Sequence, residues 1–258
     1  MNKTFADLGK GLGLYRVWFY QAYHELTGKY RRTFLGPFWI SGGMIVTSIC
    51  LSVVFGPMMG GDLRLVLPYI MGGILCFGMV SFILIDGTEM FLRHGGNIKN
   101  HAYPFTYYTL ETMAKEILLF LNNVVVFYVV MVLIRAAVVP HWSIVLGFAV
   151  VIMTGLTWGS VFGIIAARFR DLRFMLPYLN QLMFFLTPIF WRPESVRGHN
   201  ILVKYNPYYG LLEIMRAPLL GEAASAHMWY LALGAMVTGI IAWLVVFSLF
   251  RRRIPFWV

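Results

Sequence analysis

The chain alternates between long apolar stretches and short polar segments, and this pattern predicts the main elements of its fold. A helix that crosses a bilayer core about 30 Å thick needs roughly 20 mostly apolar residues. Six stretches meet this requirement, at residues 37–58, 68–92, 117–139, 143–167, 172–191 and 229–250. We therefore expect an all-α integral membrane protein with six transmembrane helices and both termini on one side of the membrane.

The distribution of Lys and Arg around these stretches predicts their orientation. Fifteen of the 21 basic residues flank the spans on the side of the termini, and six lie on the opposite side. Cytoplasmic loops carry an excess of Lys and Arg in membrane proteins. Both termini are therefore expected in the cytoplasm.

Residues 1–36 are expected to form a cytoplasmic interface segment ahead of a transmembrane domain over residues 37–258. Residues 5–26 place apolar side chains on one stripe at helical spacing, which is typical of an amphipathic helix on a membrane surface. The connection over residues 93–116 is longer than two adjacent helices require, so it is expected to build a small functional element of its own.

The connection over residues 192–227 contains an apolar stretch too short to cross the membrane. Asn206 is expected to cap a helix that starts at Pro207 and ends at Pro218. A helix of about 11 residues cannot span a bilayer. We therefore expect a re-entrant outer segment, in which Glu213 and Arg216 form the charged pair of an outer gate together with Asn206 and Pro207.

Composition excludes a soluble fold. Only 12% of the residues are charged, 59% are hydrophobic and the mean hydropathy is +0.72, so a polar surface could not cover a globular core. The net charge of +10 would suit nucleic acid, but most basic residues cluster between the apolar runs, as membrane topology requires.

The sequence offers little catalytic chemistry. It contains no GxxxxGK[ST] motif, so ATP, if it is used, must be bound by another chain. All six histidines fall in loops or flanks, which argues against an intramembrane metal site. Asp86 and Glu89 could form a proton relay, but Arg93 lies four residues beyond Glu89, which favours ion pairing near the membrane boundary. No catalytic residue, cofactor or metal is therefore expected on this chain.

Two further patterns concern packing and substrate. Gly155, Gly159 and Gly163 recur every four residues, a small-residue stripe that allows close approach of another helix. Aromatic residues make up 17% of the chain, and sugar rings can stack on aromatic planes without a fixed register. The residues assigned to a glycan channel on this ground are Phe38, Trp39, Tyr178, Phe184, Phe185 and Trp191.

Six segments together resemble the membrane subunit of type-2 ABC exporters that move lipid-linked polysaccharide, and they follow the order found in that family. They are KYRRTFLGPFW (29–39), NIKNHAYPF (97–105), ARFRDLRF (167–174), LTPIFWRPE (186–194), NPYYGLLEIMRAPLLG (206–221) and RRRIPFWV (251–258). The opening LGPFW and the ending resemble the O-antigen export branch most closely.

The resemblance implies a homodimer of six-helix subunits in the bacterial inner membrane, joined to two copies of a separate ATPase subunit that binds ATP and Mg. It implies that residues 94–104 couple to this ATPase. The coupling residues would be His94, Asn97, Ile98, Lys99, Asn100, His101, Tyr103 and Pro104. Lys29, Arg31, Arg32 and Arg93 would lie near the pyrophosphate of a polyprenyl carrier, although positive-inside topology explains their charge equally well.

Several alternatives stay open at this point. The same architecture could export capsule polysaccharide, teichoic acid or a small amphiphile such as a drug. An integral membrane glycosyl or acyl transferase is an alternative from another class, and it would need converging acids, for which Asp86 and Glu89 are the candidate pair.

Overall fold

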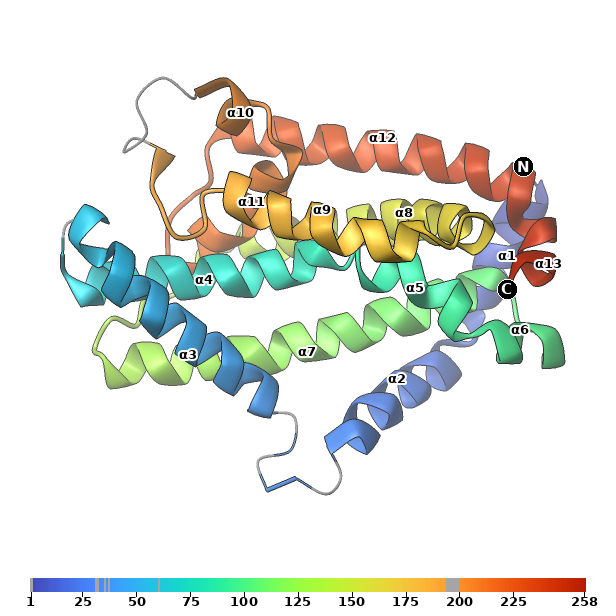
Figure 1. Cartoon of the computed structure of the whole chain (residues 1–258), viewed down its shortest axis with the longest axis horizontal. Helices are drawn as coiled ribbons and strands as arrows, with labels where there is room; N and C mark the ends of the chain where they lie inside the picture. The colour runs from blue at the N-terminus through green and yellow to red at the C-terminus, as the bar shows by residue number, and fades with distance from the viewer. Residues whose placement is uncertain (1, 31–32, 35, 37, 60, 194–199) are drawn as a thin grey trace.

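The computed structural model describes residues 2–30, 33, 34, 36, 38–59, 61–193 and 200–258, and every regular element in these residues is helical (Figure 1). The α-helices are α1 (Asn2–Gly13), α2 (Tyr15–Tyr30), α3 (Phe38–Phe55), α4 (Leu63–Ser81), α5 (Asp86–Arg93), α6 (Gly95–Asn100), α7 (Phe105–Leu133), α8 (Ile144–Arg168), α9 (Leu172–Leu186), α10 (Asn200–Lys204), α11 (Pro207–Leu219), α12 (Ala226–Phe250) and α13 (Ile254–Trp257). The short 3-10 helices are η1 (Gly56–Met59) and η3 (Arg251–Arg253).

Within the described ranges, five helical segments are long and apolar enough to cross a membrane. They are Phe38–Phe55, Leu63–Arg93, Phe105–Leu133, Ile144–Arg168 and Ala226–Trp257. Each coincides with a predicted span. The stretch predicted over residues 172–191 forms α9, whose 15 residues extend about 22 Å and fall short of a 30 Å core. The expected count of six spans is thus supported at five positions, and the sixth stays a prediction.

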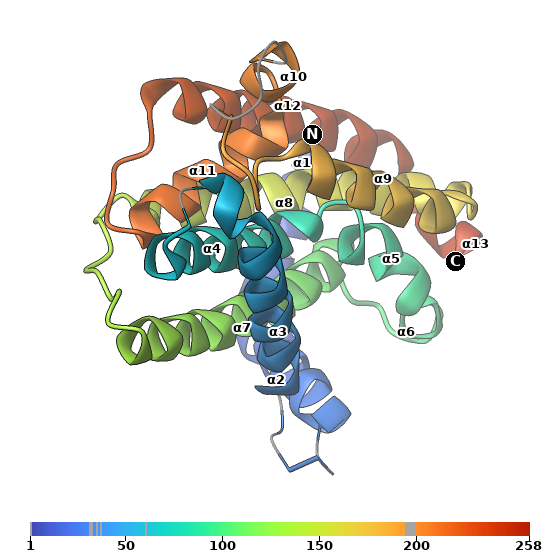
Figure 2. The same ribbon diagram turned by 60° about the vertical axis from the view of Figure 1, so that its left-hand side comes forward.

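The chain nevertheless returns across the bundle between α8 and α12. The loop after α8 lies beside the C-terminus, because Arg170 Nη2 donates to the Trp257 carbonyl over 3.2 Å. The helix α12 ends near the same terminus and runs along the bundle for 25 residues. Its first turn therefore lies at the opposite end of the bundle (Figure 1). The return begins with α9, and α11 completes it as a short helix packed against α12, α4 and α8 (Figure 2).

The second predicted span, 68–92, is divided into α4 and α5. The backbone N–H of Gly87 donates to the Phe82 carbonyl over 2.8 Å, which closes a wide turn between the two helices. This turn brings α5 close to α8: a Cβ on Gly87 would lie 2.6 Å from the Cα of Gly159, and one on Gly163 would lie 2.6 Å from the Gly87 carbonyl. A Cβ on Gly155 would meet the Met113 methyl at 2.5 Å. All three glycines of the predicted stripe therefore lie where α8 has close neighbours.

The expectation of a long connection over residues 93–116 is wrong, because α7 begins at Phe105 and the connection covers only residues 94–104. The helix extends through polar residues because their side chains have partners. Glu111 pairs with His94 over 3.6 Å, and Lys115 pairs with Glu25 over 3.4 Å.

The N-terminal segment forms two helices where one was expected over residues 5–26. The helices α1 and α2 meet at Leu14, and both pack against α7. The packing of α1 is close, since a Cβ on Gly11 would lie 2.4 Å from Thr106 Oγ1. The interface segment therefore packs against α7 on one side. It also has exposed apolar side chains, such as Tyr15 and Phe19.

Candidate functional site

The short helix α6 lies at the end of the bundle that carries both termini (Figure 1). Ile98 is buried in a cluster with residues of α5, α7 and α8, and this contact anchors the helix. Gly95 sits against the C-terminal residue, since a Cβ there would lie 3.4 Å from Val258 Cβ. The C-terminal turn therefore supports α6 from one side.

The residues expected to couple to an ATPase divide into anchors and an exposed face. His94 and Ile98 are buried and Pro104 is half-buried. The exposed members are Asn97, Lys99, Asn100, His101 and Tyr103. This division gives α6 and the extended residues after it a polar surface that points away from the bundle.

The junction between this segment and α7 is fixed by a residue distant in sequence. Pro104 precedes α7 and has no side-chain acceptor to cap it. The carboxylate of Asp7 on α1 takes this role, accepting the backbone N–H of Thr106 over 3.1 Å and that of Phe105 over 3.4 Å. A carboxylate at a helix N-terminus satisfies free N–H groups and the helix dipole. The contact joins α1 to the start of α7.

A network of charged side chains links α2, α5 and α7. Arg93 Nη2 lies 3.3 Å from both Asp86 and Glu89, as the ion-pairing interpretation predicts. Lys115 Nζ lies 3.7 Å from Asp86 and 3.4 Å from Glu25. Both acids that could have served a relay or a transferase are therefore paired with cations.

The structure describes two of the four residues assigned to a lipid pyrophosphate. Arg93 is exposed but engaged in this charged network. Lys29 belongs to the last turn of α2, and Arg31 and Arg32 lie outside the described residues. Their assignment stays a prediction.

Both ring nitrogens of His94 face acceptors. Its Nδ1 lies 2.8 Å from the Met90 carbonyl and its Nε2 lies 3.6 Å from Glu111 Oε1. Since both neighbours are acceptors, the geometry suits a doubly protonated, positively charged ring. Burial lowers the pKa of His94, but the hydrogen bond and negative charge of Glu111 outweigh burial, so the pKa is raised above its usual value.

Ligand atoms of Glu25, His94 and Glu111 also lie within 4.8 Å of one another, a spacing that could hold a metal ion. Two cations already face this group, since Lys115 and Arg93 lie 3.4 Å and 3.9 Å from Glu25 Oε1. Ion pairing therefore accounts for the arrangement of these carboxylates.

We expect the charge on His94 to make stability pH-dependent. Because its folded-state pKa is raised, the contribution is complete below the unfolded pKa near 6.5 and disappears as pH rises through the folded value. The wild-type unfolding temperature should therefore fall between about pH 6 and about pH 9 by more than that of His94→Gln. His101→Gln, at an exposed histidine, should keep the wild-type slope. Equal slopes in all three proteins would contradict this assignment.

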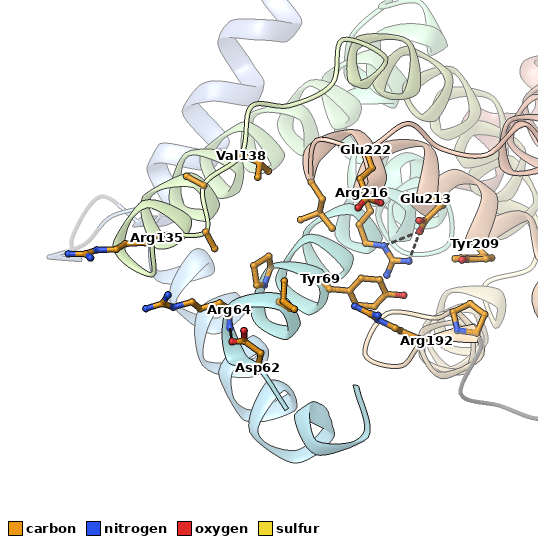
Figure 3. A pocket seen from close by; sticks show the side chains of 16 residues that line it. Asp62, Arg64, Tyr69, Arg135, Val138, Arg192, Tyr209, Glu213, Arg216 and Glu222 are labelled. Carbon is orange, nitrogen blue, oxygen red and sulfur yellow. Dashed lines mark hydrogen bonds and ion pairs between the residues drawn. The ribbon is translucent and has the colours of Figure 1, made fainter. Parts of the chain in front are cut away.

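At the opposite end of the bundle, Glu213 and Arg216 form a pair inside the protein. Arg216 is 1% exposed, and its Nε donates to Glu213 Oε2 over 3.0 Å while Nη2 contacts the same oxygen (Figure 3). Its Nη1 donates to the Pro188 carbonyl over 2.6 Å, and its guanidinium lies 4.0 Å from the centre of the Tyr69 ring. The side chain thus ties α11 to α4 and to the bend after α9.

Residues of α11 and α4 position the Arg216 side chain. Asn206 caps α11 as predicted, with Oδ1 accepting the backbone N–H of Tyr208 over 2.9 Å. The helix ends at Leu219, one residue after Pro218. On α4, a Cβ at Gly73 would lie 3.1 Å from Ile189 and 3.4 Å from Arg216 Nη1, so a larger residue there would displace the bend or the arginine.

The end of α7 carries an unusual arginine. Arg135 has φ of +58°, a conformation that costs a residue with a side chain about 1 kcal/mol or more. Its N–H bonds to the Val132 carbonyl over 3.1 Å, and the next N–H, of Ala136, bonds to the Met131 carbonyl over 2.9 Å. This is the Schellman arrangement, whose left-handed position usually holds glycine. No residue pattern around Arg135 predicts this strain.

The residues expected to line a glycan channel lie on two separate elements. Phe38 and Trp39 are exposed at the start of α3. Tyr178 and Phe185 are exposed on α9, while Phe184 packs against Phe77 with ring centres 5.3 Å apart. Trp191 is half-buried, and its Nε1 donates to the Phe185 carbonyl over 3.4 Å. The described ring contacts within the chain do not join the α3 pair to the α9 group.

Comparison with known proteins places these features in a family. The model of the ABC-2 type transporter family matches residues 19–220, which include α3 to α11 and all of the segment around α6. A search of curated proteins gave no match.

Proposed function

The chain belongs to the ABC-2 type transporter family, and we propose that it is the membrane subunit of an exporter of polyprenyl-pyrophosphate-linked polysaccharide, of the O-antigen type. The observation that carries the transport role is the family match over most of the chain. The polysaccharide is proposed from the six segments that resemble the exporters of lipid-linked glycans.

Energy is proposed to come from a separate ATP-binding subunit, since subunits of this family pair with one. The exposed face of α6 suits docking of such a partner, because Ile98 and the C-terminal turn hold the helix in place while Asn97, Lys99 and Asn100 stay free to contact it. In this arrangement two ATPase subunits, carrying ATP and Mg, bind a homodimer of the chain.

The membrane arrangement follows from the same reasoning. The excess of basic residues around α1, α6 and α13 supports a cytoplasmic location for both termini in the bacterial inner membrane. The exposed aromatic side chains of α3 and α9 are proposed to face the glycan path in the dimer, where two subunits together can enclose it. The Glu213 and Arg216 pair then lies on the outer side.

The structure argues against one of the alternative functions and is compatible with the others. A glycosyl or acyl transferase would need free acids, and Asp86 and Glu89 are both paired with Arg93. Exporters of capsule, teichoic acid or small amphiphiles share the proposed architecture, so substrate assays must separate them.

The test is ATP hydrolysis by the chain reconstituted with its ATPase subunit. We expect no hydrolysis by the purified chain alone, and stimulation of the complex by lipid-linked O-antigen glycan above that by the same lipid carrier without glycan. Stimulation by hydrophobic cations in place of the glycan would favour drug export. Hydrolysis by the chain alone would overturn its assignment as a transport subunit.

A further inference from the structure

A cavity of about 820 Å³ opens at the end of the bundle opposite the termini (Figure 3). Its walls come from the first turns of α4, the segment after α7, residues 192–193 and α11. Four arginines reach it from these separate elements: Arg64, Arg135, Arg192 and Arg216. A second, smaller cavity of about 410 Å³ is also lined by Arg64 and Arg135.

Three of the four guanidinium groups lack a carboxylate partner among the residues that the structure describes. Arg216 is neutralised by Glu213. Arg192 lies against the Tyr69 ring, 5.7 Å from its centre, and Figure 3 shows Arg64 and Arg135 together at the other side of the cavity. Arg64, Arg135 and Arg192 are all exposed. Like charges gathered from separate elements repel one another unless an anion lies between them.

The acids of the cavity do not remove this excess. Asp62 caps α4, with Oδ1 accepting the backbone N–H of Arg64 over 2.9 Å. Figure 3 shows Glu222 near Arg216, away from the Arg64 and Arg135 side. With four arginines and three carboxylates, the lining keeps an excess of positive charge, which suits a group with one or more negative charges.

The position of the cavity indicates where the anion comes from. Arg64 is the second residue of α4, and Arg135 follows the last residue of α7 by two positions. Both helices belong to segments long and apolar enough to cross a membrane, so their ends lie at the depth of lipid headgroups. Arg135 also holds a left-handed conformation that glycine would adopt without strain, which indicates that its side chain is needed there.

We propose that this cavity is a binding site for the phosphate group of a lipid, held by the guanidinium groups of Arg64 and Arg135, while Arg192 adds positive charge from the other side of the cavity. A planar guanidinium donates two parallel hydrogen bonds to phosphate oxygens, which makes arginine well suited to this group. The phosphate belongs either to an anionic phospholipid or to the polyprenyl carrier of the cargo, and the experiment below separates the two. With the orientation proposed above, the site faces the outer leaflet, but the binding itself does not depend on the cargo or on that orientation.

The test measures lipid binding to the purified full-length chain in detergent by titration and native mass spectrometry. The probes are phosphatidylglycerol, a polyprenyl diphosphate, phosphatidylcholine and inorganic phosphate. We expect the two anionic lipids to bind more tightly than phosphatidylcholine. Arg64→Gln and Arg135→Gln should each weaken binding about tenfold, and Arg192→Gln should weaken it less, since Arg192 lies on the other side of the cavity. Lys204→Gln, which removes an exposed charge at the same end but outside the cavity, should bind as the wild type does.

Arg135→Gly separates loss of binding from loss of folding. Glycine relieves the positive φ, so the variant should unfold at the same or a higher temperature than the wild type while binding lipid about tenfold more weakly. Arginine-dependent binding of both anionic lipids identifies a general lipid-phosphate site, and binding of the diphosphate alone identifies the carrier. Unchanged affinity in the arginine variants, or binding of inorganic phosphate without preference for lipid, would overturn the proposal. Because no transport is measured, this result is independent of the test of the proposed function.

Discussion

Replacing Glu213 with alanine is expected to destabilise the protein by about 3–5 kcal/mol, the cost of leaving one member of a buried ion pair without its partner. Arg216 is 1% exposed and donates two of its contacts to the Glu213 carboxylate. The remaining bond to the Pro188 carbonyl and the contact with the Tyr69 ring do not neutralise its charge. The measurement is the midpoint of thermal or denaturant unfolding of the purified chain in detergent.

Glu222→Ala is the matched control, because Glu222 borders the same cavity but is exposed and forms no ion pair among the described residues. It should change stability by less than about 0.5 kcal/mol. The double variant Glu213→Ala/Arg216→Met should recover most of the loss, since an apolar side chain of similar length needs no charged partner. Equal unfolding midpoints for Glu213→Ala and Glu222→Ala would show that the pair does not stabilise the fold.

Exchanging the two charges should recover less than the apolar double variant. In the exchanged pair, a carboxylate at position 216 would face the Pro188 carbonyl, which now accepts a hydrogen bond from Arg216 Nη1. Two acceptors would then oppose each other at the bend after α9. If the pair also serves as an outer gate, Glu213→Ala should increase dye leak through the reconstituted dimer while Glu222→Ala does not.

Hydropathy predicted the positions of the apolar segments better than the bounds of the helices that contain them. Each of the five candidate spans contains a long apolar stretch, so its position could be read directly from the sequence. The first three turns of α7 carry Glu111 and Lys115, and nothing in the local pattern indicates that these residues have partners on α2 and before α6. A helix that leaves the membrane is stabilised by tertiary contacts that hydropathy does not report.

The candidate sites depended even more on contacts between distant residues. Asn206 caps its own helix two residues ahead, so its role was predictable. Asp7 caps α7 from nearly one hundred positions away, and Arg216 reaches the carbonyl of Pro188 across a bend whose course the sequence does not specify. Likewise, the three arginines that line the lipid-phosphate cavity come from separate elements that only the fold brings together.

Replacing residues 97–103 with a Gly/Ser linker is expected to abolish export. The linker removes the polar face of α6 that we propose to dock the ATPase, while the flanking helices keep the lengths needed for membrane insertion. It also removes the buried anchor Ile98 and the ring of Tyr103, which is exposed but stacks on Tyr107 with centres 4.8 Å apart. Loss of export in this variant alone would not distinguish docking from anchoring.

A second variant separates these two causes. It keeps Ile98 and Tyr103 and replaces only exposed residues, namely Asn97, Lys99, Asn100 and His101, with alanine. Replacing these exposed side chains leaves the packing of α6 intact, so we expect the variant to unfold at the wild-type temperature. Its binding to the ATPase and its export should fall at least tenfold. Lys204→Ala, at the other end of the bundle, should change neither. If the linker variant lost export while the alanine variant exported normally, α6 would act only as a structural support. The docking surface would then have to be sought on the neighbouring exposed faces of α1 and residues 168–173.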